Sequence, residues 1–255
     1  MERDWQSVFE ETYAAPPSLV AARVGRGVFG ADYPEGVDPY SFVSLGELRR
    51  IAAEIRVGEG ETFADAGCGR GGPGLWVAAA TGARLIGLDI ASPALEAARR
   101  HADVMGIAAR AEFRVGSFED TALGTSSVDG VMSVDALLFA PDKHAALAEL
   151  RRIMRPNARL VFTSWDYDRQ PVGRAPQVDD HRPLLAAAGF DVLAYEETEE
   201  WRRRITDMTA GLLENADELA AESGDDVAIV RERLEEMQAT IETMRRRILV
   251  VAAAR

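Results

Sequence analysis

The sequence contains little cysteine, little histidine and fewer basic than acidic side chains. Of its 255 residues one is cysteine, Cys68, and three are histidine. A disulfide framework within the chain and metal clusters of the Cys-x-x-Cys type are therefore excluded, and we expect no metal. Lys and Arg together number 29 against 42 Asp and Glu, which gives a net charge of −13. This balance argues against a nucleic-acid or anionic-membrane partner, because both require a basic face.

Long apolar segments are also absent. No uninterrupted apolar run reaches membrane-spanning length, and residues 1–5 are charged, without the apolar centre of a signal peptide. Hydrophobic residues still make up 47% of the chain, which is ample for a packed core. We therefore expect a cytoplasmic protein that forms either one large domain or a domain with a modest cap, and no membrane partner.

The most informative segment that is present runs from Phe63 to Gly74. An apolar run leads into five glycines, and a helical pattern starts at Leu75. Glycine allows positive φ and a close approach of the backbone to a ligand. The helix N-terminus adds unpaired N–H groups and a partial positive charge. Strand, glycine turn and helix in this order predict a nucleotide-binding loop.

Strands and helices alternate around this loop. We expect strands over residues 62–66, 84–89, 111–115, 128–134, 160–165, 190–195 and 247–252. We expect helices over residues 45–55, opened by a capping box of Ser44 and Glu47, over 75–80, from an N-cap at Ser92 to Gly106, from a cap at Asp142 through Arg155, and over 181–188. This rhythm predicts an α/β fold with a mostly parallel sheet and helices on both faces.

Two segments stand outside this rhythm. Residues 1–44 carry scattered aromatics and read as a helical, aromatic cap on a core of residues 45–198. Residues 199–246 predict an antiparallel helical hairpin, broken at Ser223-Gly224, before a last core strand at 247–255. Its apolar seams contain Trp201, Ile205, Met208, Leu212, Val230, Leu234, Met237, Ile241 and Met244. The two helices either pack on each other or form the interface of a homodimer.

The glycine spacing alone leaves two ligands open. Gly67, Gly69 and Gly72 fit a dinucleotide fingerprint, and Asp89 lies 22 residues beyond the first of them. A Walker loop is excluded, since no Gly-Lys-Ser/Thr follows. An acid also stands two residues before the first glycine, at Asp65, where dinucleotide binders usually carry an apolar residue.

Several motifs in order resemble the class I S-adenosylmethionine-dependent methyltransferases, in particular their small-molecule branch. The resemblance covers residues 45–195. Its motifs are Asp65-Ala-Gly-Cys-Gly-Arg-Gly71, Leu88-Asp89-Ile90, Gly116-Ser-Phe-Glu-Asp120, Ser127-Val-Asp-Gly-Val-Met-Ser133 and Leu150-Arg-Arg-Ile-Met-Arg-Pro-Asn-Ala-Arg-Leu160. It implies a Rossmann-like sheet of seven strands with an antiparallel last strand and a helical lid. Asn157 replaces the usual glycine after the proline, and asparagine tolerates the left-handed conformation.

The resemblance also implies where S-adenosylmethionine, and its product S-adenosylhomocysteine, would lie. Asp89 would accept both ribose hydroxyls, because a carboxylate offers two acceptor oxygens. Ile90 and Phe118 would enclose the adenine, with Ser117 at its polar edge. Asp65 would lie near the ammonium group of the cofactor or brace the loop. The remaining expected cofactor residues are Ala66, Gly67, Gly69 and Ser133. Cys68 is expected to be a small filler, because methyl transfer needs no protein nucleophile.

Ligands of open α/β sheets bind at the carboxyl ends of the strands. That rule assigns the acceptor to Asp135, Leu138, Phe139 and Trp165, with Ser133 and Asp166 nearby. The aromatic residues of the cap either wall this pocket or pack the cap; they are Tyr13, Phe29, Tyr33, Tyr40 and Phe42. The family often has a histidine before Pro141, where this chain has Phe139-Ala140. Asp166, His144 and His181 are the remaining candidates for a catalytic group.

These residues favour an enzyme that methylates a small molecule, a metabolite or natural product, at a hydroxyl. Methylation at nitrogen or carbon is the first alternative. A nucleotide-binding oxidoreductase and a catalytically silent scaffold with the same fold are the others.

Overall fold

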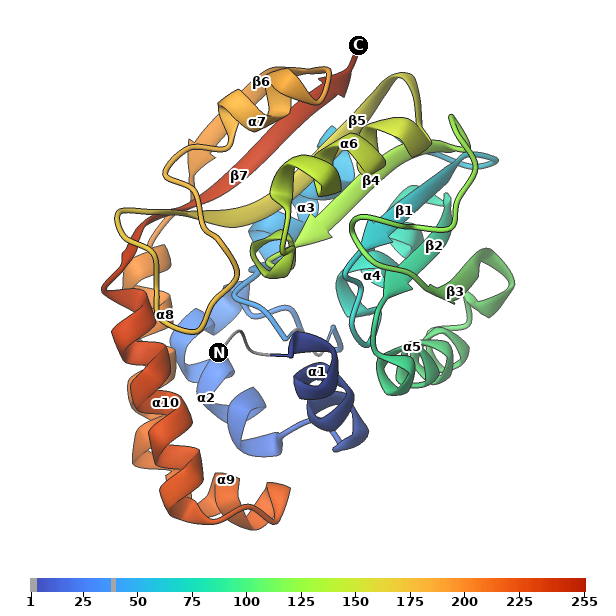
Figure 1. Cartoon of the computed structure of the whole chain (residues 1–255). Helices are drawn as coiled ribbons and strands as arrows, with labels where there is room; N and C mark the ends of the chain where they lie inside the picture. The colour runs from blue at the N-terminus through green and yellow to red at the C-terminus, as the bar shows by residue number, and fades with distance from the viewer. Residues whose placement is uncertain (1–3, 38–39) are drawn as a thin grey trace.

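The computed structural model describes residues 4–37 and 40–255, so the first three residues of the expected cap, and 38–39 within it, lie outside this range. Its centre is a seven-stranded sheet in the order β3-β2-β1-β4-β5-β7-β6 (Figure 1). The strands are β1 (Thr62–Ala66), β2 (Arg84–Asp89), β3 (Ala111–Val115), β4 (Val128–Val134), β5 (Met154–Tyr167), β6 (Phe190–Glu197) and β7 (Met244–Ala254). β7 alone runs antiparallel to its neighbours. The expected fold class is confirmed.

Helices cover both faces of the sheet. Those of the core are α3 (Leu45–Glu54), α4 (Gly72–Thr81), α5 (Ser92–Val104), α6 (Lys143–Ile153) and α7 (Arg182–Ala187). The short 3-10 turns are η1 (Gly30–Asp32), η2 (Ala108–Arg110) and η3 (Leu137–Phe139). Outside the core lie α1 (Trp5–Ala14), α2 (Leu19–Phe29), α8 (Trp201–Glu214), α9 (Ala216–Ser223) and α10 (Val227–Ile241).

The alternation of side chains along the strands builds two apolar layers. Val161 of β5 packs in the layer under α3, α4 and α5, while its neighbour Phe162 packs in the layer under α6 and α7. Both side chains are fully buried. Successive residues of a strand face opposite sides, so one apolar run serves both layers. Because helices cover both faces of the sheet, a ligand can reach it only where the strands end.

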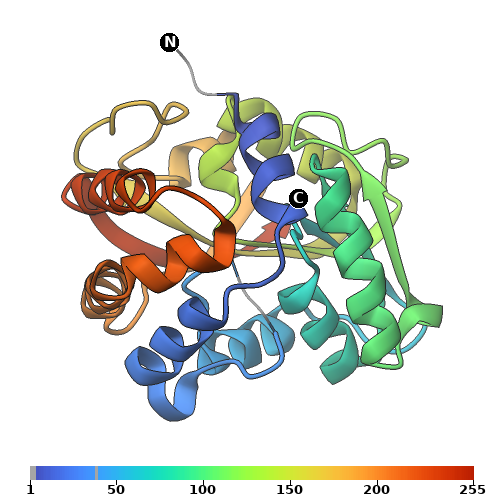
Figure 2. The ribbon, with the colours of Figure 1, turned by 90° about the horizontal axis from the view of Figure 1, so that it is seen from below.

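The segments outside the core meet over one of these edges. The carboxyl ends of the parallel strands point toward α1, α2 and the α8–α10 insertion (Figure 1). Seen from below, α1 lies across this edge, with α5 on one side and the insertion on the other (Figure 2). α1 contacts α5, and α2 contacts α8. A third apolar cluster joins the insertion to β5 through Leu138, Trp165, Tyr167, Trp201, Ile205, Ile241 and Met244. We call it the lid cluster.

Some expected boundaries were wrong. α6 ends at Ile153, and Arg155 lies in β5, because Pro156 pushes the residue before it to an extended conformation. Met244 belongs to β7, since pairing with Tyr167 overrides its helical spacing. Ser92 lies inside α5 and caps nothing. The insertion contains three helices, with an additional break at Asn215.

Other local expectations were confirmed. Ser44 and Glu47 form the reciprocal hydrogen bonds of a capping box at the start of α3. Asp142 caps α6 by accepting hydrogen bonds from the His144 and Ala145 N–H groups. Asn157 has a φ of 65°, the left-handed conformation that replaces glycine here.

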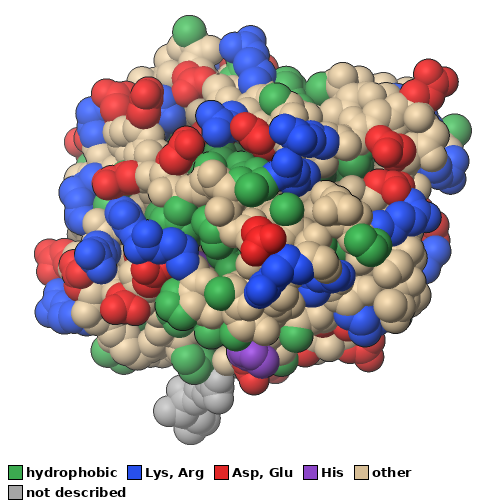
Figure 3. Space-filling view, turned by 90° about the horizontal axis from the view of Figure 1, so that it is seen from above, with side chains coloured by type: hydrophobic (Ala, Val, Ile, Leu, Met, Phe, Trp, Pro, Cys, Tyr) green, Lys and Arg blue, Asp and Glu red, His purple; other side chains and the backbone are tan. Residues whose placement is uncertain are grey.

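The face opposite the lid carries acidic and basic side chains side by side (Figure 3). Across the described part of the chain, every helix is too short or too polar to span a bilayer.

Candidate cofactor and acceptor site

The glycine loop is held against the end of β2. The Gly67 and Cys68 N–H groups both donate to the Leu88 carbonyl, at 2.8 and 2.9 Å. Gly69 has a φ of 51°, which glycine adopts without a Cβ penalty. At Gly72, a Cβ would lie only 1.6 Å from the Val37 carbonyl oxygen, so the cap chain packs directly on the start of α4. The loop therefore requires glycine for both its turn and its contact with the cap.

Asp89 holds the loop through hydrogen bonds to its backbone. Its Oδ2 accepts a hydrogen bond from the Gly69 N–H at 2.8 Å, and its Oδ1 accepts from the Ala91 N–H at 3.0 Å. Burial raises the pKa of this carboxyl, while the backbone N–H groups act in the opposite direction. Each carboxylate oxygen has a second lone pair, so both can still accept from a ligand hydroxyl.

Asp65 lies beneath the loop with a different environment. Its side chain is 1% exposed, and neither oxygen has a hydrogen-bond partner of normal geometry within residues 4–37 and 40–255. Burial, and then the charge of Asp89, raise its pKa to about 7, against which the Gly74 N–H acts. A buried carboxylate without a partner is costly. It fits a cationic ligand group such as the ammonium of S-adenosylmethionine.

The other expected cofactor residues surround the loop. Phe118 is half-buried and packs on Gly67, where a Cβ would meet its ring at 3.3 Å, and Ile90 is half-buried beyond Asp89. The Ser117 hydroxyl accepts from the Glu119 and Asp120 N–H groups, so it caps its own turn. The buried Ser133 hydroxyl donates to the Ala66 carbonyl at 2.8 Å and ties β4 to β1.

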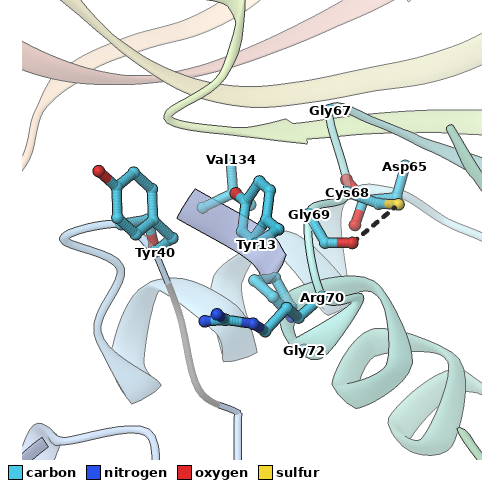
Figure 4. A pocket seen from close by; sticks show the side chains of 11 residues that line it. Tyr13, Tyr40, Asp65, Gly67, Cys68, Gly69, Arg70, Gly72 and Val134 are labelled. Carbon is cyan, nitrogen blue, oxygen red and sulfur yellow. Dashed lines mark hydrogen bonds between the residues drawn. The ribbon is translucent and has the colours of Figure 1, made fainter. Parts of the chain in front are cut away.

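Tyr13 of α1 covers the same loop. A Cβ on Gly69 would lie 2.7 Å from the Tyr13 hydroxyl, and Figure 4 shows the Tyr13 ring between Tyr40 and Gly69. These residues, with Asp65 and Val134, line a cavity of about 30 Å³. That volume has room for water but is far below that of a nucleotide-sized ligand site. Tyr13, expected on the acceptor side, therefore lies at the cofactor loop.

Aromatic rings fill the space above this cavity. Phe9 stacks on Tyr13 with ring centroids 5.9 Å apart, and it meets Phe139 edge-on at 4.9 Å. Trp5 packs on Phe139 at 4.8 Å, and Tyr40 meets Tyr13 at 5.8 Å. This aromatic cluster attaches α1 to the carboxyl edge of β4.

The remaining expected wall residues separate into two places. Phe42 lies in the acceptor region, edge-on to Trp165 at 6.1 Å. Phe29 and Tyr33 pair with each other at 6.5 Å, under the Arg204 and Arg26 guanidinium groups, in the corner between α2 and α8. The structure thus brings Phe42 to the site and leaves Phe29 and Tyr33 in the cap.

Asp135 is the centre of a buried polar network. Arg247 donates to both of its oxygens, at 3.1 and 3.0 Å, and also donates to Glu47. The Phe42 N–H and the Thr163 hydroxyl donate to the same carboxylate at 2.9 and 2.7 Å. Asp135, expected to contact the acceptor, is therefore occupied by protein groups that join the cap, β4, β5 and β7.

Leu138 and Phe139 are fixed from the other side by the single lysine of the chain. The Lys143 ammonium donates to the carbonyls of Leu138, Ala140 and Pro176 at 3.2, 3.3 and 2.5 Å. Burial lowers its pKa to about 8, although the charge of Glu119 acts in the opposite direction. The lysine holds the loop around Pro176 against η3.

The three candidate catalytic groups lie elsewhere. Asp166 is fully buried and accepts hydrogen bonds from His181 Nδ1 at 3.0 Å, the Tyr195 hydroxyl at 2.6 Å and Arg246 Nε at 2.8 Å. His181 is fully buried too, against Phe162 in the layer under α6 and α7. His144 is exposed on α6. The structure brings Asp166 and His181 together but places neither in the aromatic cavity.

Sequence reasoning missed Arg247, Lys143 and Tyr167. Only Arg247 gave a signal, as a charge beside the apolar run of the last strand. Its partners come from 112 and 200 residues away, which no local pattern encodes. Searched over the described residues, His, Cys, Asp and Glu form no group of three or more that could hold a metal ion.

Comparison with known proteins agrees with this geometry. Residues 64–162 match the methyltransferase domain family. The chain is similar to the sterol 24-C-methyltransferase of Pneumocystis carinii (strain B80), with 26% identity over 166 residues, or 58% of this chain and 44% of the relative. It is similar to the O-methyltransferase cnsE of Penicillium expansum, with 27% identity over 211 residues, or 77% of this chain and 75% of the relative.

Among solved structures, the chain is similar to the [4+2]-cyclase SpnF, with a TM-score of 0.72 and 21% identity over 82% of this chain and 80% of that one. At that identity the likeness shows the fold. The chain spans about half the length of several curated relatives, 44%, 46% and 51% of three of them. Together these comparisons confirm the resemblance to class I S-adenosylmethionine-dependent methyltransferases that the motifs indicated.

Proposed function

We propose that this chain, whose residues 64–162 are a methyltransferase domain, transfers a methyl group from S-adenosylmethionine to a small molecule. The observation that carries this proposal is the buried Asp65 carboxylate beneath the glycine loop. It would repel the pyrophosphate of a dinucleotide, whereas it would attract the ammonium group of the methyl donor. This difference favours the methyl donor over the nicotinamide cofactor that the glycine spacing alone also permits.

The residues around the loop would hold the donor in a defined orientation. Asp89 would accept hydrogen bonds from the ribose hydroxyls, and Ile90 and Phe118 would enclose the adenine. Ala66, Gly67 and Gly69 would line the path of the amino-acid end, with Ser133 bracing β4 behind it. When bound, the donor supplies an activated methyl group, and S-adenosylhomocysteine remains after the transfer. We propose no metal for this step.

The protein would then mainly align the acceptor and exclude water. Alignment of two reactants can contribute on the order of 7–11 kcal/mol. The aromatic rings of Tyr13, Tyr40, Phe42 and Phe139, together with Leu138, would shield the transfer from solvent. The catalytic role of Asp166, His144 and His181 stays a prediction, since the transfer needs a base only for a weakly acidic acceptor.

We favour a hydroxyl as the acceptor. The relatives named above methylate oxygen in one case and carbon in the other, and neither fixes the atom for this chain. We also propose that residues 1–44 and 199–246 act as caps on a core of residues 45–198 and 247–255. A cytoplasmic location and a homodimer formed through the insertion stay predictions.

Calorimetric titration with S-adenosylmethionine, S-adenosylhomocysteine and NADH tests the proposal. We expect both sulfur ligands to bind and NADH not to bind. A screen of small-molecule acceptors, read by mass spectrometry, should then show a gain of one methyl group. Tight binding of NADH alone would instead support the oxidoreductase, and donor binding without any methylated product would support the silent scaffold.

A further inference from the structure

Two neighbouring side chains of β5 carry buried polar atoms without a protein partner. Trp165 and Tyr167 are each 3% exposed, yet neither the indole Nε1 nor the phenol oxygen makes a hydrogen bond within residues 4–37 and 40–255. They stand two residues apart on one strand, so they project from the same face. That face meets the lid cluster, whose other members are apolar side chains or, at Trp201, an indole that donates to Glu197 at 2.7 Å.

Their position makes this pairing unusual. An unmade hydrogen bond in an apolar environment is destabilising, and native proteins keep few such groups. Here two lie together at the carboxyl end of β5, where open α/β sheets bind their ligands. Phe42 contacts the Trp165 ring, and the Arg247 guanidinium lies 5.5 Å from its centroid. Both neighbours belong to the network that closes the acceptor region around Asp135.

The two groups offer a defined hydrogen-bonding pattern. The indole N–H can only donate, whereas the phenol can donate and accept. Burial raises the pKa of Tyr167, against the charge of Arg174 and together with that of Asp135, so the phenol stays neutral. Gln177, which lines the same cavity as Tyr167, donates to the Leu138 and Ala175 carbonyls and keeps a buried carbonyl oxygen as a further acceptor.

The charged groups beside Trp165 are engaged by the protein, whereas Asp168, Arg169, Asp179 and Asp180 line the open cavity on the Tyr167 side. Arg247 neutralises Asp135, and three backbone carbonyls surround the Lys143 ammonium. A charged acceptor group that reached Trp165 would find no counter-ion on that side and would lose its hydration there. An uncharged molecule would lose little hydration free energy on entering the same region.

From these observations, and resting on the methyltransferase function proposed above, we propose that Trp165 and Tyr167 form the polar subsite of the acceptor pocket. They bind an oxygen atom of the acceptor, which is an uncharged, mainly apolar molecule bearing a hydroxyl or carbonyl group. The apolar lid cluster holds the rest of that molecule.

The first experiment needs no ligand. Tyr167→Phe removes an unpartnered hydroxyl, so we expect an unchanged or higher Tm. Tyr195→Phe is the matched control, because its hydroxyl donates to Asp166 and its loss should lower Tm by several degrees. Trp165→Phe and Trp201→Phe form a second pair. If Tyr167→Phe lowers Tm as much as Tyr195→Phe does, the hydroxyl is satisfied within the free protein and the proposal is overturned.

The second experiment measures binding of probes to the protein with and without S-adenosylhomocysteine. The probes are naphthalene, decalin and androstane, each as hydrocarbon, alcohol and carboxylate. We expect an alcohol to bind at least tenfold more tightly than its hydrocarbon and its carboxylate, and Tyr167→Phe or Trp165→Phe to reduce this preference below threefold. Tyr195→Phe and Trp201→Phe should preserve it. Preference for a carboxylate, or for no alcohol, overturns the subsite. Failure of S-adenosylhomocysteine itself to bind would count against the methyltransferase function. The preference of the ligand-free protein for an alcohol over its hydrocarbon and carboxylate would still decide the subsite.

Discussion

Arg247 holds both carboxylate oxygens of Asp135, through its Nε at 3.1 Å and its Nη2 at 3.0 Å, although 112 residues separate them. Both side chains are nearly inaccessible to water. Asp135 also has a φ of 50°, and its backbone N–H donates to the Thr163 hydroxyl at 3.0 Å. The last strand, the end of β4 and the cap are thus joined at one point beside the expected methyl-transfer site.

Removal of one partner of this pair should be strongly destabilising. Arg247→Met would leave the Asp135 charge buried without its cation, and we expect a loss of about 3–5 kcal/mol in the free energy of unfolding. Urea titration measures it. Arg203→Met is the control, because Arg203 pairs with Asp207 on the surface and should cost less than about 1 kcal/mol. Equal losses in the two variants would show that the buried network does not hold the fold together.

Asp89→Ala should weaken the binding of S-adenosylhomocysteine more than tenfold, and a tenfold change corresponds to about 1.4 kcal/mol of binding free energy. The substitution removes the expected ribose contacts and the hydrogen bond from Gly69 that shapes the loop. Calorimetry measures the affinity. Asp103→Ala, an exposed aspartate of α5, is the control and should bind as the wild type does. An unchanged affinity in Asp89→Ala would remove Asp89 from the site.

The affinity for S-adenosylhomocysteine should rise with pH up to about 7 and then level off. Asp65 titrates at about 7 in the free protein and would be ionised beside the ammonium group of the ligand. Below that pH, binding must release a proton, and the affinity should fall toward tenfold per pH unit. Titrations between pH 5.5 and 8 test this. Asp65→Asn should show a flatter profile, and a profile as steep as that of the wild type would assign the titration to another group.

The raised pKa of Asp65 also fixes the sign of its effect on stability. The folded state binds the proton more tightly than the unfolded state, whose carboxyl titrates near 3.8. The stabilisation from this group is therefore present at low pH and is lost as the pH rises toward and through 7. Asp65→Asn should remove this decline. Tm measured across the same pH range, against the wild type, gives the comparison.

Acidification should remove the stabilising contribution of Asp166, which is the opposite pH dependence to that of Asp65. Burial would raise its pKa, but hydrogen bonds from His181, Tyr195 and Arg246 outweigh burial and lower it below 3.8. Its stabilisation is then complete above the unfolded pKa of about 3.8 and is lost as the pH falls below that value. Asp166→Asn should be less stable than the wild type at pH 7, and the gap should narrow as the pH falls below 3.8. A gap that persists there would show that charge is not its source.

Tyr13 should control entry of the methyl donor. Its ring covers Gly69 above a cavity of about 30 Å³, so α1 or the ring must move before a ligand enters. Tyr13→Ala should raise both the association and the dissociation rate of S-adenosylhomocysteine at least threefold in stopped-flow measurements. Phe29→Ala, in the same cap but in the α2–α8 corner, should leave both rates unchanged. Identical rates in all three proteins would show that α1 does not gate the site.

The sequence by itself determined the sheet and the loop. Short apolar runs predicted the strands, because each strand must bury side chains in two layers. The glycines of residues 67–74 predicted the turn, because a side chain would clash there. The sequence also places Asp65 and Asp89 beside the loop, since their positions along the chain are fixed relative to it. These features depend on neighbours in sequence.

The tertiary structure alone decided which side chains meet at the acceptor edge. Tyr13 was expected at the acceptor wall but lies at the glycine loop, and Phe29 and Tyr33 lie away from the site. These positions depend on the packing of α1 against α5 and of α2 against α8. Arg247 became the partner of Asp135 only because β7 returns antiparallel beside β5. Contacts across 100 or more residues are set by how the layers pack, and no local spacing of residues records them.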